Sequence, residues 1–220
     1  MREAVLAANL ALPAHGLVTL TWGNVSGIDR ERGVVAIKPS GVPYESMTAA
    51  DVVLVDLEGN VVEGERRPST DTPTHLELYR AYEWIGGIVH THSTWATAWA
   101  QAEREIPLLG TTHADLSASP IPLVRALTES EVAEDYEGAT GRALVEATTE
   151  HDSCALVRGH GPFAWGGSPA AAVEAAVTLE QVARLALLTT LLAPDPPLLP
   201  DAIRRKHFER KHGPHAYYGQ

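Results

Sequence analysis

From residue 74 onward, short apolar segments alternate with longer helical ones, and this alternation restricts the fold more than any other feature of the sequence. Short apolar runs predict buried strands, whereas the longer segments predict helices. A chain of this kind packs helices against both faces of a sheet. The expected helices span 74–84, 93–103, 136–150 and 168–192, and the expected strands span 86–90, 121–124, 154–158 and 163–165.

The first part of the chain predicts one helix followed by hairpins. An Ala- and Leu-rich segment over 2–15 is typical of a helix. Strands are expected over 17–28 and 34–38, and a strand–turn–strand pattern follows over 51–63. The expected fold is therefore an α/β protein with a single domain over 1–220. It is a three-layer α/β/α sandwich around a mainly antiparallel or mixed sheet.

Composition and charge exclude several classes of protein. The 220 residues carry a net charge of −11, and the only short basic run lies within 204–211, so nucleic-acid binding is not expected. Cys154 is the single cysteine and can form no intrachain disulfide. The N-terminus lacks the features of a signal peptide, and the longest apolar stretch, 185–194, is too short to span a membrane. A cytoplasmic protein is expected.

Three histidines follow apolar strand segments. His90 and His92 stand at a strand end, where residues two apart point to the same side and can place two imidazoles on one metal ion. His160 lies between two glycines after another apolar strand. Imidazole suits zinc, and a catalytic zinc site typically has three protein ligands. Alone, the H-x-H pair fits two loop histidines better, but together with His160 and nearby acids it predicts a metal site.

Asp71 has two interpretations. It or Thr72 could cap the helix that is expected to begin near residue 74. The same helix N-terminus could also bind an anion such as phosphate, with hydroxyl donors from Ser69 and Thr70.

Two earlier turns add groups that could bind phosphate. Lys38 ends a strand and is followed by Ser40 and Gly41, and a lysine with a hydroxyl and a glycine N–H can cradle a phosphate. The segment is not a P-loop. Asn24 lies in a second polar turn, beside a glycine that lets a ligand approach the backbone. Each motif alone is a turn by default.

The remaining candidates lie further along the chain. Asp115 ends the polar segment 110–115, which is expected to be a loop, and an Asx-turn and a catalytic role remain equally open for it. Glu137 lies on an expected helix, where a solvent-exposed role is the default. The tail contains His207 and the pair Tyr217-Tyr218, and a tyrosine near a metal or a lysine could deliver a proton.

Together these motifs resemble the class II aldolase/adducin family, and specifically its L-ribulose-5-phosphate 4-epimerase branch. The resemblance covers essentially the whole chain. H-x-H with a later H-G is shared across the family, whereas T-T-H-A-D and the ending A-Y-Y-G-Q are more particular to the epimerases. The motifs lie at 21–26, 37–41, 69–75, 87–93, 110–115, 160–165, 211–213 and 216–220.

The resemblance implies an enzyme with one Zn²⁺ per subunit, or another divalent metal in its place. It implies a homotetramer with active sites at subunit interfaces, each completed by a tail over 200–220. Asp115 and Tyr218 would be the acid–base pair, and Thr111, Glu137 and His207 would support them from a neighbouring subunit. The implied metal ligands are His90, His92 and His160, with Asp71 as a possible fourth. The implied substrate-binding residues are Asn24, Lys38, Ser40, Gly41, Ser69 and Thr70.

The implied reaction interconverts L-ribulose 5-phosphate and D-xylulose 5-phosphate by breaking and remaking a carbon–carbon bond. An aldolase similar to fuculose-phosphate aldolase, or another sugar-phosphate epimerase, would use the same metal site. A non-catalytic adducin-like interaction module would need neither the histidines nor the acid–base pair. The chain departs from many epimerases in carrying Thr70 where they have a second serine, and the segment before Cys154 is shorter than in some relatives.

Overall fold

The structure is a computed structural model that describes residues 1–218. Gly219 and Gln220, the end of the A-Y-Y-G-Q motif, lie outside the described residues. The helices are α1 (Arg2–Ala14), α2 (Thr72–Ala81), α3 (Thr94–Gln101), α4 (Thr111–Leu116), α5 (Glu129–Ala147), α6 (Pro169–Leu192) and α7 (Asp201–His212). The strands are β1 (Asn24–Asp29), β2 (Val34–Ile37), β3 (Val53–Asp56), β4 (Val61–Glu63), β5 (Gly87–His90), β6 (Cys154–Val157) and β7 (Gly161–Gly166).

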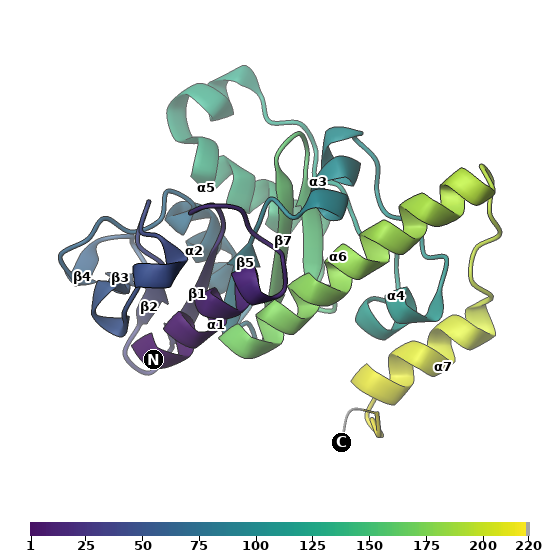
Figure 1. Cartoon of the computed structure of the whole chain (residues 1–220), viewed down its shortest axis with the longest axis horizontal. Coiled ribbons are helices and arrows are strands. Elements are labelled where there is room, and N and C mark those ends of the chain that lie inside the picture. The colour runs from purple at the N-terminus through teal and green to yellow at the C-terminus, as the bar shows by residue number, and fades with distance from the viewer. Residues whose placement is uncertain (219–220) are drawn as a thin grey trace.

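The strands form one sheet in the order β4-β3-β2-β1-β5-β7-β6, and each neighbouring pair is antiparallel. The expected three-layer sandwich is confirmed, since α1, α3 and α6 pack on one face of the sheet and α2 and α5 on the other (Figure 1). Strand β6 illustrates how the sheet separates two apolar layers, because successive side chains of a strand point to opposite faces. Cys154 and Leu156 belong to one apolar cluster, whereas Ala155 and Val157 belong to the other.

The expected strand over 17–28 is too long, because β1 begins only at Asn24. Leu20 and Gly23 adopt positive φ angles of 54° and 78°, which interrupt the extended backbone. The loop 17–23 turns sharply before the sheet begins. A β-carbon on Gly23 would lie 2.9 Å from the His90 carbonyl oxygen, so this position requires glycine.

The segment 110–115, expected as a loop, forms helix α4 after Gly110. His113, Ala114 and Leu116 are buried, and the helix packs against α6 and α7. The segment is helical because one of its faces is buried in the tertiary structure. Its polar composition gave no indication of such a buried face, so the sequence predicted a loop.

Two other expectations need correction. No strand forms over 121–124, because the backbone of this segment changes partner and makes only isolated bridges, from Ile121 to Ile106 and from Leu123 to Leu156. Helix α5 begins at Glu129 instead of residue 136. Thr128 and Glu131 form a capping box at its start, and non-helical angles at Asp135 kink the helix.

Helix α6 is long and apolar enough to cross a membrane by length and composition alone, which the count of the stretch 185–194 did not reveal. Ser168 caps its start as expected, and its side chain accepts a hydrogen bond from the Ala171 N–H. Alanine and branched residues along one side are buried against β5 and β7. This packing is typical of a core helix that covers a sheet.

Candidate metal centre

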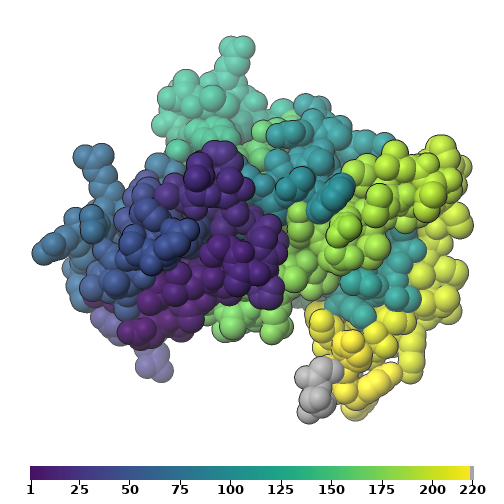
Figure 2. Space-filling view, viewed as in Figure 1, coloured from purple at the N-terminus to yellow at the C-terminus, as the bar shows by residue number. Residues whose placement is uncertain are grey.

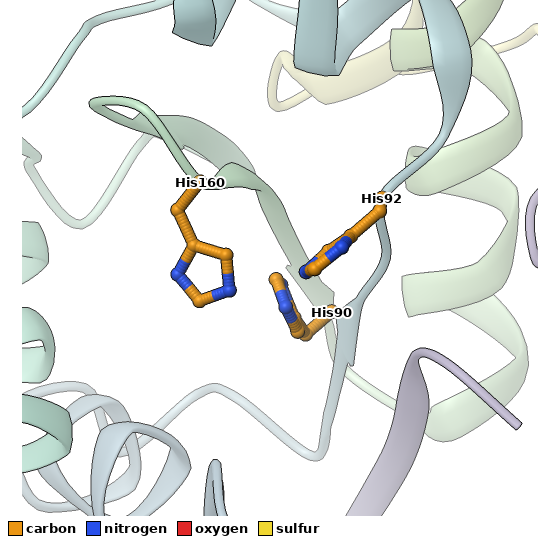
Figure 3. A group of neighbouring side chains, drawn as sticks. All are labelled: His90, His92 and His160. Atoms are coloured by element: carbon orange, nitrogen blue, oxygen red, sulfur yellow. The ribbon is translucent and has the colours of Figure 1, made fainter.

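The three predicted histidines converge at one end of the sheet (Figure 3). His90 ends β5, His92 follows two residues later, and His160 lies in the turn between β6 and β7. One nitrogen from each ring lies within 4.8 Å of those of the other two. The ring centroids are 4.7 to 5.1 Å apart. We call these residues the histidine cluster.

The chemistry of the cluster fits a metal ion. His90 Nδ1 lies 3.0 Å from the Pro162 carbonyl oxygen, which can only accept, so Nδ1–H donates and Nε2 keeps its lone pair for a metal. Burial lowers the pKa of His90 to about 3 and also lowers the pKa of His160. Both rings are therefore neutral at pH 7, as metal ligands must be. The Phe163 ring stacks on His90 at 4.2 Å and fixes its plane.

The histidine cluster forms one wall of a polar cavity of about 320 Å³. The register of the sheet places Asn24 beside the histidine cluster, because Asn24 of β1 pairs with His90 of β5. Ten of the residues predicted to bind metal or substrate line this cavity, whereas Thr111, Glu137 and His207 do not. The ten are Asn24, Lys38, Ser40, Gly41, Ser69, Thr70, Asp71, His90, His92 and His160.

Asp71 occupies the N-cap position of α2, but its side chain does not cap the helix. Asn24 Nδ2 instead donates to Asp71 Oδ2 at 2.7 Å and to Ser69 Oγ at 3.0 Å. The carboxylate thus faces the cavity, although among residues 1–218 the group of mutually close metal-ligating atoms comprises the three histidines alone. Its role as a fourth ligand stays a prediction.

Lys38 is almost fully buried at the back of the cavity, with 2% of its surface exposed. Its Nζ donates to the carbonyl oxygens of Thr21 and Pro39. Among the described residues it has no acidic partner within ion-pair distance. Burial lowers the pKa of this lysine. A buried ammonium group without a counter-ion is a natural site for an anion.

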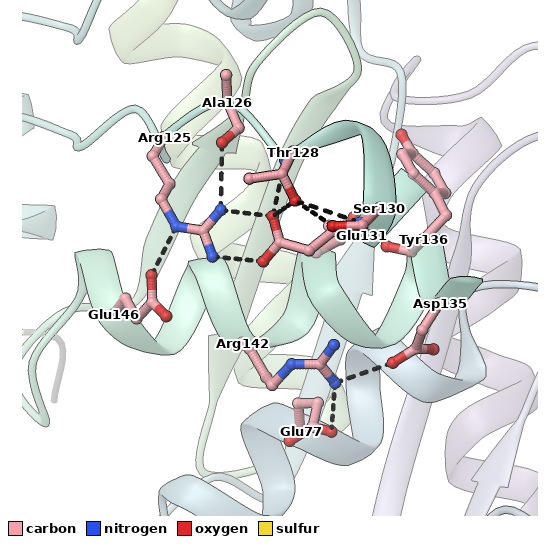
Figure 4. A network of polar contacts seen from close by, with 11 residues as sticks. Glu77, Arg125, Ala126, Thr128, Ser130, Glu131, Asp135, Tyr136, Arg142 and Glu146 are labelled. Atoms are coloured by element: carbon pink, nitrogen blue, oxygen red, sulfur yellow. Dashed lines mark hydrogen bonds and ion pairs between the residues drawn. The ribbon is translucent and has the colours of Figure 1, made fainter. Parts of the chain in front are cut away.

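Tyr136, which sequence analysis did not single out, lies against the histidine cluster. Its hydroxyl lies 3.3 Å from His160 Nδ1, and a partner on this nitrogen leaves Nε2 for a metal. Arg142 holds the kink of α5 by binding Asp135 at 2.9 Å and lies 3.7 Å from Glu77 on α2 (Figure 4). The kink therefore brings Tyr136 to His160. In the sequence, Tyr136 was marked only by its position beside Glu137, a predicted site residue. The backbone oxygen of Glu137 accepts a hydrogen bond from the Thr74 hydroxyl of the same chain.

Asp115 lies elsewhere, in a cluster between α4 and the tail. Arg210 donates to both of its carboxylate oxygens, at 3.1 and 2.8 Å, and His207 Nδ1 donates at 3.1 Å. The Arg210 guanidinium also lies 4.2 Å from the centre of the Tyr218 ring. We call Asp115, His207, Arg210 and Tyr218 the tail cluster. Sequence analysis had noted Arg210 only as part of a basic run.

The two clusters lie at opposite ends of β7. His160 precedes the first residue of the strand, whereas Asp115 lines a second cavity of about 530 Å³ together with Trp165 and Gly166 at its other end. A six-residue strand spans about 17 Å. Helix α7 lies at one end of the molecule, away from β3 and β4 (Figures 1 and 2). Within one chain, Thr111, Asp115, His207 and Tyr218 do not line the histidine cavity.

Two buried histidines outside the histidine cluster make stability depend on pH. Burial lowers the pKa of His75 and of His113 to about 4 in the folded chain. The unfolded chain, with a histidine pKa of about 6.5, takes up protons first as the pH falls. The stabilisation is complete above about pH 6.5 and is lost progressively between pH 6.5 and 4.

Replacing His113 with glutamine is expected to flatten this dependence. The loss of unfolding free energy between pH 7.5 and pH 5 should shrink by roughly 2 kcal/mol, because one such titrating group is removed. Urea unfolding at both pH values measures the difference. His151, whose side chain is 79% exposed, provides the control, and His151→Gln should behave as the wild type. An unchanged pH dependence in His113→Gln would contradict the assignment.

Comparison with known proteins agrees with this architecture. The model of the Class II Aldolase and Adducin N-terminal domain matches residues 3–187. A solved structure of L-fuculose 1-phosphate aldolase is 27% identical, with a TM-score of 0.83, over 95% of this chain and 94% of that one. L-fuculose-1-phosphate aldolase from Thermus thermophilus is 28% identical, with a TM-score of 0.70, over 89% of this chain and 100% of that one.

A more distant structure shares the fold. A sugar-phosphate aldolase from Thermotoga maritima is 20% identical, with a TM-score of 0.69, over 89% of this chain and 96% of that one. At this level of identity the likeness concerns the fold alone. The sandwich and its antiparallel sheet therefore recur across proteins whose sequences have diverged widely.

Proposed function

The chain belongs to the class II aldolase and adducin family, and we propose that it is a zinc-dependent L-ribulose-5-phosphate 4-epimerase. The observation that carries this proposal is the tail cluster, where Arg210 contacts both the Asp115 carboxylate and the Tyr218 ring. An epimerase needs an acid and a base as a pair. One arginine joins the two residues that the sequence predicts for these roles.

The chemistry of the substrate explains why a pair is needed. The hydrogen on the fourth carbon of a ketopentose phosphate is not acidic, because the ketone lies two carbons away. Breaking the bond between the third and fourth carbons avoids this difficulty. One member of the pair takes the proton of the fourth-carbon hydroxyl, the aldehyde fragment turns its other face, and the bond forms again. The second member then protonates the new alkoxide.

The histidine cavity would hold the substrate during these steps. His90, His92 and His160 would bind the metal, which supplies Lewis-acid stabilisation of negative charge on the substrate oxygens. Lys38, assisted by Ser40, Ser69 and Thr70, would hold the phosphate while the aldehyde fragment turns. Zinc fits three imidazoles well, and other divalent metals can also use such a site.

A complete active site would need two copies of the chain. The histidine cavity and the cavity lined by Asp115 lie at opposite ends of β7, a strand that spans about 17 Å, so a substrate in the histidine cavity would not reach Asp115 of the same chain. A neighbouring subunit would bring its own Asp115 and Tyr218 to the cavity of the first, so that residues 200–220 complete the site of another copy. A cyclic homotetramer in the cytoplasm is the assembly we expect.

A sugar-phosphate aldolase is the second candidate. Two of the structurally similar proteins carry the name L-fuculose 1-phosphate aldolase. An aldolase would use the same metal site and the same bond cleavage but would release its fragments. The fate of the aldehyde fragment separates the two activities.

The test follows D-xylulose 5-phosphate formed from L-ribulose 5-phosphate, before and after metal stripping and zinc restoration. We expect zinc-dependent conversion without accumulation of free glycolaldehyde phosphate. Cleavage of a sugar phosphate with release of an aldehyde and dihydroxyacetone phosphate would support the aldolase instead. Purified protein that binds no metal and converts no sugar phosphate would support a non-catalytic, adducin-like role.

A further inference from the structure

Tyr44 lies behind the histidine cavity and contacts two of its walls. Only 2% of its surface is exposed, and it does not itself line the cavity. Its ring lies under the Lys38 ammonium, 4.8 Å from Nζ. Its hydroxyl lies 2.8 Å from the Trp22 carbonyl oxygen and 2.9 Å from that of Gly23. One side chain therefore contacts both the buried lysine and the loop 17–23, which also binds that lysine through the Thr21 carbonyl oxygen.

The Tyr44 ring stabilises the buried ammonium group of Lys38. A buried ammonium group is costly unless charged or polar groups surround it. Among the described residues Lys38 has two carbonyl partners and no carboxylate, so the Tyr44 ring provides the third favourable contact. The aromatic face stabilises the cation without neutralising it. The positive charge thus remains available to an anion in the cavity.

The Tyr44 hydroxyl binds carbonyl oxygens of the loop 17–23. Leu20 and Gly23 both lie at positive φ, so the backbone holds a conformation that most residues avoid. The Thr21 carbonyl oxygen of this loop accepts a hydrogen bond from Lys38. The carbonyl oxygens of Trp22 and Gly23 accept from the Tyr44 hydroxyl. Tyr44 thereby links the loop to the lysine.

We infer that Tyr44 is a positioning residue for anion binding, with its ring holding the Lys38 ammonium in place at the phosphate end of the cavity. The inference rests on the proposed function for its choice of ligand, a phosphate group. Tyr44 contacts no substrate itself. Its ring and its hydroxyl can be tested separately, because phenylalanine keeps the ring alone and leucine keeps neither.

The experiment measures the Kd for inorganic phosphate by calorimetry on the metal-loaded protein. Tyr44→Leu should weaken phosphate binding by about 5- to 30-fold, the range expected when a partly desolvated cation–π contact is lost. Tyr44→Phe should stay within about threefold of the wild type, since the ring remains. With L-ribulose 5-phosphate, Tyr44→Leu should raise KM in the same proportion and change kcat much less. Lys38→Met defines the part of phosphate binding that depends on the lysine.

Tyr79→Phe controls for a structural role alone. Tyr79 is another buried tyrosine, its hydroxyl lies 2.8 Å from Ser26 Oγ, and it does not line the cavity. This variant should lower the melting temperature and leave the phosphate Kd unchanged. Equal phosphate affinity in Tyr44→Leu and the wild type would overturn the inference, as would an equal loss in Tyr44→Phe and Tyr44→Leu. So would equal binding by Lys38→Met and the wild type.

The inference and the proposed reaction can fail separately. If L-ribulose 5-phosphate is not converted but the phosphate affinities follow the expected order, the reaction is wrong and the role of Tyr44 stands. If the substrate is converted but Tyr44→Leu changes neither the phosphate Kd nor KM, the reaction stands and the role of Tyr44 is wrong.

Discussion

Replacing His92 with alanine is expected to abolish metal binding and, with it, the reaction. His92 is the most exposed member of the histidine cluster, so its loss should leave the fold intact. Loss of a direct ligand should weaken metal affinity beyond the roughly 100-fold that removal of a ligand's hydrogen-bond partner can cost. Turnover should fall about 1000-fold or more, because Lewis-acid stabilisation is worth several kcal/mol. Metal per chain, measured by emission spectrometry after dialysis, checks the first effect.

One exposed histidine outside the cluster provides the control for this result. His15→Ala removes an exposed histidine that lines neither the histidine cavity nor the cavity of Asp115, and it should keep both metal and activity. His90→Ala would be less informative, because His90 is buried and stacks on Phe163, so its loss also disturbs the core. A full complement of metal in purified His92→Ala would show that the three imidazoles are not the metal site.

Replacing Asp115 with asparagine is expected to lower turnover while leaving the metal bound. Asparagine keeps the shape of the side chain but cannot act as a base, which should cost about 100- to 10,000-fold in kcat. The histidine cavity does not include this residue, so metal content should match that of the wild type. Initial rates of L-ribulose 5-phosphate conversion, with metal content measured on the same sample, check both statements.

The matched control lies on the same tail. Asp201→Asn on α7 removes the exposed partner of Arg204 and tests whether loss of any carboxylate in this region harms the enzyme. An exposed pair of this kind contributes about 0–1 kcal/mol, so both stability and rate should change little. Wild-type turnover in Asp115→Asn would remove this residue from the proposed acid–base pair.

The sequence predicted the histidine cavity better than the tail cluster, and geometry explains why. Extended backbone fixes the direction of each side chain, so His90 and His92 could be placed on one side of their strand from the sequence alone. The antiparallel register then sets Asn24 beside His90. Local rules of strand geometry were sufficient for this half of the site.

The tail cluster depends on contacts that no local rule contains. Arg210 and Asp115 are 95 residues apart, and α4 becomes helical only because its apolar face packs on α6 and α7. Tyr136 reaches His160 through the kink at Asp135, whereas the expected helix began at residue 136 and contained no kink. The Thr128 and Glu131 capping box was visible in the sequence and would have corrected that start.

The antiparallel pairing of β5 and β7 has a consequence for how the protein matures. His90 pairs with Phe163, and a slip of one residue between these strands would turn the imidazole to the opposite face of the sheet. Such a misfolded chain would keep its strand content but could not gather three ring nitrogens. A metal ion that binds the histidine cluster would therefore add its binding free energy only to correctly paired chains. Such an ion would favour the correctly paired sheet during folding.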